Sequence, residues 1–164
     1  MADFSEEDFE DAVKHLLTSL SSGGFHFNLK MEQKQALRQL VFGGDLLAIL
    51  PTGFGKSLIF QLLVRVKEVL TKKDCCVIVV CPLKSIIDDQ LAEARSLGLK
   101  AGALSDLNVE DDELASFHLL FGSAEEVLQQ KFLAVLKKSN KLYERVIAVV
   151  VDESHTVETW TGQR

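Results

Sequence analysis

Apolar and polar positions along this 164-residue chain follow two different periods. In five stretches the apolar side chains recur every three or four positions, which predicts amphipathic helices. These stretches are residues 6–20, 31–42, 58–70, 86–97 and 127–136. The first stretch follows Ser5, whose hydroxyl can cap a helix, and it has acidic residues in its first turn. It ends at the helix-breaking run Ser21-Ser22-Gly23-Gly24.

Short apolar runs between these helices are typical of β-strands. They are residues 46–50, 75–81, 100–104, 118–121 and 146–151. The second and last runs are apolar throughout, as in strands that are buried on both faces of a parallel sheet. Residues 106–116 are polar, and we expect a loop with a short helix there. Strands that alternate with helices predict an α/β fold, a three-layer α/β/α sandwich with a mostly parallel sheet.

The composition is that of a globular protein, because apolar residues make up 47% of the chain. No apolar run has the length that spans a bilayer, so we expect no membrane partner. The acidic start has neither the basic nor the apolar part of a secretory leader. Cys75, Cys76 and Cys81 lack Cys-x-x-Cys spacing, and we expect reduced, buried thiols in an intracellular protein.

The net charge of −6 is concentrated at the N-terminus. Six acidic residues precede the first basic one, Lys14; they are Asp3, Glu6, Glu7, Asp8, Glu10 and Asp11. The other 18 acidic residues balance the 18 basic ones, so the body of the chain is neutral. This balance does not support a broad basic face for nucleic acid, but it allows a narrow groove that contacts a few phosphates.

The most specific motif is the run Leu50-Pro51-Thr52-Gly53-Phe54-Gly55-Lys56-Ser57, between a predicted strand and a predicted helix. Gly53 and Gly55 can aim successive backbone N–H groups at an anion, and the helix N-terminus adds its positive dipole. Lys56 can reach the β- and γ-phosphates, and the Ser57 hydroxyl can hold Mg²⁺. Only Leu50 departs from the usual phosphate-loop pattern, since it stands where the leading glycine is expected. The run predicts a nucleoside triphosphate site.

A pair of carboxylates follows the apolar run 146–151. In open α/β sheets, ligands bind at the carboxyl ends of the strands, where Asp152 and Glu153 are expected. Asp152 would hold Mg²⁺, and Glu153 would orient the water that attacks the γ-phosphate. A strand that ends in two solvated acids is also a common arrangement, so it is the pairing with the phosphate loop that favours the functional interpretation.

Other classes of phosphate-loop protein fit the sequence less well. GTPases that select guanine use Asn-Lys-x-Asp, but Asn140-Lys141 is followed by Leu142-Tyr143. A small-molecule kinase has no need for Asp-Glu-Ser-His directly after its second strand. ATP hydrolysis is therefore the favoured reaction.

At Asp152-Glu153-Ser154-His155 the sequence resembles the superfamily-two helicases, and further stretches narrow the resemblance to the RecQ type. Residues 29–33 resemble the segment ahead of the phosphate loop, where a glutamine reads the adenine edge. That role falls on Gln33, with Lys30 where the family usually has arginine. A residue other than glycine at position 50 is normal in this family. The resemblance implies ATP and Mg²⁺ as cofactors, bound by Lys30, Gln33 and the loop residues 52–57, with Lys56, Asp152 and Glu153 catalytic.

Three further residues are assigned to DNA by the resemblance. Pro82 lies in residues 79–90, which are similar to a family motif that contacts the DNA backbone. Trp160 begins a segment similar to the aromatic-rich loop that couples DNA binding to hydrolysis, and a base could stack on its ring. His155 would link the ATP site to that loop. A weak resemblance to another DNA-side motif lies at Ser123-Ala124-Glu125.

The resemblance also implies parts that the 164 residues do not contain. A helicase of this type has a second RecA-like domain with arginine fingers, and a strand with Ser-Ala-Thr in its first domain. We therefore expect a fragment or a truncated gene model, with an acidic helix and linker at 1–24 and a RecA-like helicase domain at 25–164. The implied activity is 3′-to-5′ DNA unwinding in repair or recombination, nuclear in a eukaryote. The alternative is a catalytically silent interaction module.

Overall fold

A computed structural model describes residues 4–26, 28–51, 54–108, 112–138 and 140–152 of the chain. The structure divides into two compact units, Met1–Cys75 and Cys76–Arg164, which are described separately. None of the helices in the described ranges is both long enough and apolar enough to cross a membrane. The domain boundary expected after residue 24 stays a prediction.

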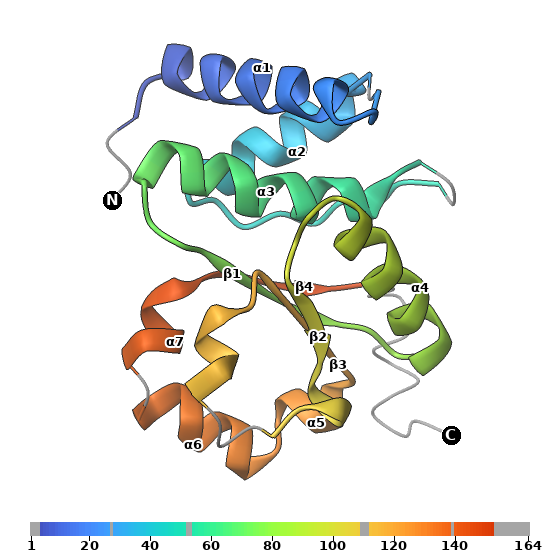
Figure 1. Cartoon of the computed structure of the whole chain (residues 1–164), viewed down its shortest axis with the longest axis vertical. Helices are drawn as coiled ribbons and strands as arrows, with labels where there is room; N and C mark the ends of the chain where they lie inside the picture. Colours follow the sequence, from blue (N-terminus) through green and yellow to red (C-terminus); the bar gives the residue numbers. More distant parts are fainter. Residues whose placement is uncertain (1–3, 27, 52–53, 109–111, 139, 153–164) are drawn as a thin grey trace. The chain divides into compact units, whose positions relative to one another are not determined.

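The described residues of the first unit form three helices, α1 (Glu6–Ser22), α2 (Met31–Val41) and α3 (Lys56–Thr71) (Figure 1). Ser5 caps α1 as expected, and together with Asp8 it forms a capping box. Phe9 of α1 is fully buried, and its ring centroid lies 6.1 Å from that of Phe42. Beside this apolar contact, Lys34 of α2 forms an ion pair of 2.6 Å with Glu10 of α1. The three helices predicted in this region are confirmed, and α1 packs on its neighbours through a buried apolar stripe.

The strand predicted at residues 46–50 is wrong. The sheet of the described residues does not include this segment, and Leu47 and Ile49 are 74% and 87% exposed. A strand exists only where its backbone N–H and C=O groups pair with a neighbouring strand, and apolar composition alone cannot supply that neighbour. The segment therefore leads into the phosphate loop as irregular chain.

The second unit is built on a four-stranded parallel sheet of order β2-β3-β1-β4. The strands are β1 (Cys76–Val80), β2 (Ala101–Ala103), β3 (Leu119–Gly122) and β4 (Val146–Val151). Every residue of β1 is buried, as its continuous apolar run predicts. The α/β class and the parallel sheet expected from the sequence are confirmed.

Helices and two short 3₁₀ turns complete this unit. They are α4 (Lys84–Ser96), η1 (Leu104–Asp106), η2 (Asp112–Ser116), α5 (Ala124–Val127), α6 (Gln130–Lys138) and α7 (Asn140–Arg145). The helix predicted over 127–136 is confirmed over residues 130–136, which lie in α6, but its predicted start is wrong, because Val127 belongs to α5 and Leu128 is the C-cap of that helix. Ser123 and Glu126 form a capping box that starts α5 early. Leu128 is left 67% exposed, whereas Phe132 of α6 is fully buried.

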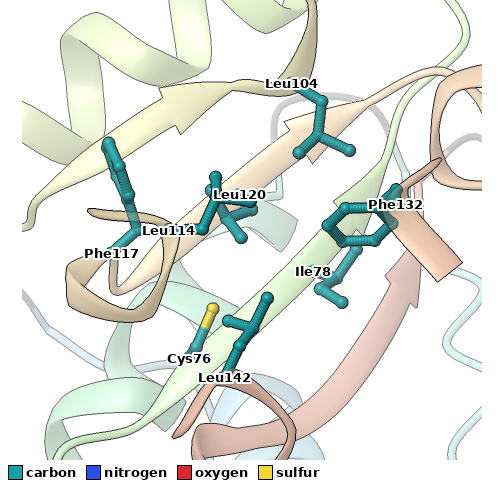
Figure 2. Packing of buried hydrophobic residues seen from close by; sticks show 8 residues of the cluster. All are labelled: Cys76, Ile78, Leu104, Leu114, Phe117, Leu120, Phe132 and Leu142. Atoms are coloured by element: carbon teal, nitrogen blue, oxygen red, sulfur yellow. The ribbon is translucent and has the colours of Figure 1, made fainter. Parts of the chain in front are cut away.

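One face of the sheet carries a hydrophobic cluster of buried residues (Figure 2). Alternate residues of β1, Cys76 and Ile78, contribute to it together with Leu120 of β3. Phe132 of α6 and Leu142 of α7 pack into the same cluster, and both are fully buried. The cluster packs against β1, an inner strand of the sheet, and β1 in turn pairs with β4, the strand that Asp152 directly follows.

Candidate nucleotide-binding site

The phosphate loop ends in a left-handed residue at the start of a long helix. Gly55 has φ of +85° and is the N-cap of α3, a conformation that a residue with a side chain rarely adopts. Just before it in the sequence, the Phe54 N–H donates to the Pro51 carbonyl oxygen at 3.1 Å. Lys56 and Ser57 are the first two residues of the helix and are both half-buried. The backbone thus presents both side chains at the positive end of the helix dipole.

The residues at this helix start suit a polyphosphate chain. Among the described residues no side chain caps α3, and its first turn contains no acidic residue. A helix N-terminus, with its positive dipole, and a lysine at the same point can bind an anion. Thr52 and Gly53, the other loop residues predicted to bind the nucleotide, lie outside the described residues.

Two side chains at the start of α2 contact the phosphate loop. Gln33 is 3% exposed, and its Nε2 donates to the carbonyl oxygens of Phe54 at 3.1 Å and Gly55 at 3.0 Å. Its Oε1 accepts from the Lys30 backbone N–H at 2.9 Å. The Lys30 Nζ donates to the Phe54 carbonyl oxygen at 3.2 Å and lies 4.1 Å from the centroid of the Phe54 ring. The structure thus brings three of the predicted binding residues, Lys30, Gln33 and Phe54, into direct contact.

In the second unit, Asp152 directly follows β4. Its backbone N–H donates to the Val80 carbonyl oxygen at 2.9 Å, which continues the pairing with β1. Its Oδ2 accepts from Gln90 Nε2 of α4, also at 2.9 Å. A carboxylate is a suitable ligand for Mg²⁺, a hard cation that prefers oxygen. Lys56 and Ser57 belong to the first unit and Asp152 to the second, so their action at one site stays a prediction.

Gln90 is a site residue that the sequence interpretation did not select. It lies three and four positions after Ile87 and Ile86, on the same face of α4. The Gln90 side chain is therefore half-buried, and a half-buried amide needs a hydrogen-bond partner. That position among apolar residues was the available signal. By donating to Oδ2, Gln90 can fix the orientation of the Asp152 carboxylate.

The remaining predicted residues are partly outside the described ranges. Glu153, His155 and Trp160 fall in the undescribed part of the chain. Pro82 lies just after β1, between that strand and α4, and is half-buried. Its role at DNA, like the roles of the other site residues, stays a prediction.

Comparison with known proteins identifies the family. The DEAD/DEAH box helicase family matches residues 30–164, which is most of the chain and includes both motifs. The chain belongs to this family. Members of the family bind ATP, and the chain is a helicase ATPase domain homologous to RecQ helicases.

Curated relatives confirm the resemblance to the RecQ type. ATP-dependent DNA helicase Q-like 5 of Arabidopsis thaliana is 32% identical over 79% of this chain and 14% of its own length. RecQ-like DNA helicase BLM of Xenopus laevis is 29% identical over 84% of this chain and 10% of its length. ATP-dependent DNA helicase Q1 of Rattus norvegicus is 28% identical over 97% of this chain and 26% of its length. The chain therefore spans about a quarter or less of each of these relatives.

Proposed function

We propose that this chain is the first motor domain of a DNA helicase, in which ATP hydrolysis drives strand separation. The observation that carries the proposal is the start of α3, where a left-handed Gly55 precedes Lys56 and Ser57 at a helix end without a side-chain cap among the described residues. Such a start binds polyphosphate through backbone N–H groups and a lysine. The names of the relatives, which are DNA helicases, support DNA as the polymer acted on.

Each residue then has a distinct part in hydrolysis. Lys56 binds the β- and γ-phosphate oxygens and stabilises the negative charge that develops on them. Ser57 and Asp152 would hold Mg²⁺, and Gln90 keeps the carboxylate of Asp152 in place through its 2.9 Å hydrogen bond. Glu153 orients the attacking water. Mg²⁺, when bound, offsets part of the charge on the phosphate oxygens.

Three other residues couple ATP hydrolysis to DNA. Pro82 contacts the DNA backbone, Trp160 stacks on a base, and His155 connects that contact to the ATP site. A second RecA-like domain in the same protein supplies the arginine that completes the site. Unwinding in the 3′-to-5′ direction, a role in repair or recombination, and a nuclear location in a eukaryote are parts of the same proposal.

Nucleotide titration of the 164-residue chain tests this proposal. We expect weak MgATP binding that Lys56→Ala reduces by roughly 10- to 100-fold, the value of one or two charge-assisted hydrogen bonds. Lys73→Ala, a change of an exposed lysine beyond the end of α3, is the matched control and should leave binding unchanged.

Two outcomes contradict parts of the proposal. Equal binding by the wild type and Lys56→Ala would remove the ATP site and favour the silent interaction module. DNA unwinding by the 164-residue chain, lost on Lys56→Ala, would overturn the need for a second domain.

A further inference from the structure

Positive charge gathers on two neighbouring helices of the second unit, although the chain as a whole is acidic. Residues 127–151 contain five basic residues and one acidic residue, whereas the net charge of the chain is −6. We propose that Lys137, Lys138 and Lys141, together with Tyr143, form a contact for the phosphate backbone of nucleic acid, the α6–α7 ridge. The inference rests on the proposed action on DNA and adds a contact outside the motifs that the family resemblance assigns to DNA.

The ridge lies toward the amino edge of the parallel sheet. Since β3 and β4 both run parallel to β1, the chain between them must return from the carboxyl edge to the amino edge. That connection consists of α5, α6 and α7, and α7 ends at Arg145, directly before β4 (Figure 1). The six residues of β4 separate this end from Asp152 by about 20 Å. The ridge is therefore distinct from the carboxyl edge, where Asp152 and Pro82 lie.

The three lysines of the ridge are exposed, and their charges are not neutralised by the described residues. Lys137 and Lys138 lie in the last turn of α6, and Lys141 lies in the first turn of α7, which contacts α6. In the described part of the chain, none of these three side chains forms an ion pair. By contrast, Lys34 and Arg38 of α2 are each paired with a glutamate of α1. The charges of the ridge are thus available to a partner outside the fold.

Stabilisation of the helices does not account for the whole set of charges. Lys137 and Lys138 suit the negative end of the α6 dipole, but Lys141 in the first turn of α7 gains nothing from a helix dipole. Arg145 lies one turn after Lys141 and is half-buried, and its Nε and Nη1 have no hydrogen-bond partner among the described residues. Its uncompensated charge raises the positive potential of the same helix, which attracts an anion.

The composition of the ridge favours nucleic acid over an acidic protein segment. Lysine is depleted in protein–protein interfaces, whereas it is a main neutraliser of phosphates. Among the described residues of α6 and α7, Tyr143 is the one large apolar or aromatic side chain that is exposed, at 69%. The ridge thus lacks the apolar core that a protein interface needs. A single aromatic ring beside lysines suits a strand whose bases can stack on it.

Fluorescence anisotropy of a short labelled DNA, titrated with the 164-residue chain at several salt concentrations, tests the ridge. The triple variant Lys137→Ala, Lys138→Ala and Lys141→Ala should weaken duplex binding at low salt by roughly tenfold or more. It should also reduce the slope of log K against log salt by roughly 2 to 3, because each phosphate contact contributes about 0.9 to that slope. A lysine that only stabilises a helix would not change the slope.

Two further sets of variants sharpen the result. Lys14→Ala, Lys72→Ala and Lys73→Ala together remove three exposed lysines of the first unit and should change the slope by less than about 1, although the net charge changes equally. Tyr143→Ala should weaken single-stranded DNA by roughly fivefold or more and leave the duplex unchanged, because only unpaired bases can stack on the ring. Tyr143→Phe should retain binding. Far-ultraviolet circular dichroism confirms that each variant is folded.

The outcomes separate this inference from the proposed function. Equal slopes for the wild type and the triple lysine variant would overturn the ridge and leave DNA contacts elsewhere on the chain standing. No DNA binding by the wild type at low salt would also overturn it, whereas the ATP site is decided by the nucleotide titration with Lys56→Ala. If poly-glutamate bound as tightly as DNA, with the same loss in the triple variant, the ridge would belong to an acidic protein segment and the assignment to nucleic acid would be wrong.

Discussion

A methyl group added at Gly55 tests how firmly the phosphate loop is held by α2. The Gly55→Ala variant places a side chain on a residue with φ of +85° and brings its Cβ to 2.6 Å from the Gln33 Nε2. The added Cβ atom therefore has two destabilising effects. The left-handed backbone becomes strained, and Gln33 must withdraw from the carbonyl oxygens of Phe54 and Gly55.

The two effects can be given separate magnitudes. A left-handed conformation costs a residue with a Cβ about 1–2 kcal/mol. Loss of the two Gln33 hydrogen bonds costs about 1 kcal/mol each, so the expected decrease in the free energy of unfolding is about 3–4 kcal/mol in all. MgATP binding should fall as well, because the displaced backbone is the start of α3.

Gly43 provides a matched control within the same unit. It has the same φ of +85°, but no atom of the described residues lies within 4 Å of an added Cβ. Gly43→Ala should therefore cost only the backbone strain, about 1–2 kcal/mol, and leave nucleotide binding unchanged. The difference between the two variants isolates the contact with Gln33.

Urea unfolding followed by circular dichroism measures both variants, alone and in a Gln33→Ala background. In that background the clash is absent, so Gly55→Ala should cost no more than Gly43→Ala. If Gly55→Ala were as mild as Gly43→Ala with Gln33 present, the contact between α2 and the loop would not exist in solution.

Three further predictions concern the stability of the fold. Gln61 of α3 is 1% exposed, and its amide has no hydrogen-bond partner among the described residues. Gln61→Met should therefore raise the free energy of unfolding, measured in urea, by about 1–2 kcal/mol. A decrease in the free energy of unfolding would instead show that the amide has a partner. Phe132→Ala should lower the free energy of unfolding by about 3–5 kcal/mol, because it leaves a cavity. Leu128→Ala, at a 67% exposed site, should lower it by less than about 0.5 kcal/mol. Equal losses for the two variants would contradict the packing of α6. Hydrogen bonds with the Ser5 backbone N–H, and to a smaller extent with the Ser5 side chain, hold the pKa of Asp8 below its usual 3.8. The ionised carboxylate therefore stabilises the fold above pH 3.8, and this contribution is lost as pH falls through the lower pKa of the folded state. Thermal unfolding from pH 6 to acid should therefore show a shallower acid loss for Asp8→Asn, and identical profiles would refute the capping role.

Periodic patterns predicted the helices of the first unit well, because each buries one continuous apolar stripe. The same approach failed at residues 46–50, where an apolar run has no partner strand in the described sheet. Strand formation depends on a neighbour that can be far away in sequence, and local composition carries no information about it. Helix α7 was missed for a related reason. In this short helix Leu142 is fully buried, whereas the neighbouring Tyr143 is 69% exposed. An apolar pattern of this length is too short to predict a helix.

The candidate site was predictable where one short motif carries the chemistry. Gly55, Lys56 and Ser57 could be assigned from their order, since the start of a helix is a local feature. The side chains that contact the loop and Asp152 could not be predicted in this way. Gln33 lies 22 positions from Gly55 in the sequence, and Gln90 lies 62 positions from Asp152. Both are glutamines on helix faces that pack against other elements. Only the three-dimensional structure shows that one holds a backbone and the other a carboxylate.

Hydrogen–deuterium exchange of the 164-residue chain, with and without MgATP, tests the central claim most directly. The claim is that a nucleoside triphosphate binds at the loop that begins α3. We expect slower exchange in peptides that cover residues 51–60 when MgATP is added, and no such protection in Lys56→Ala. Unchanged exchange across residues 51–60 at a MgATP concentration that saturates the chain would contradict the claim.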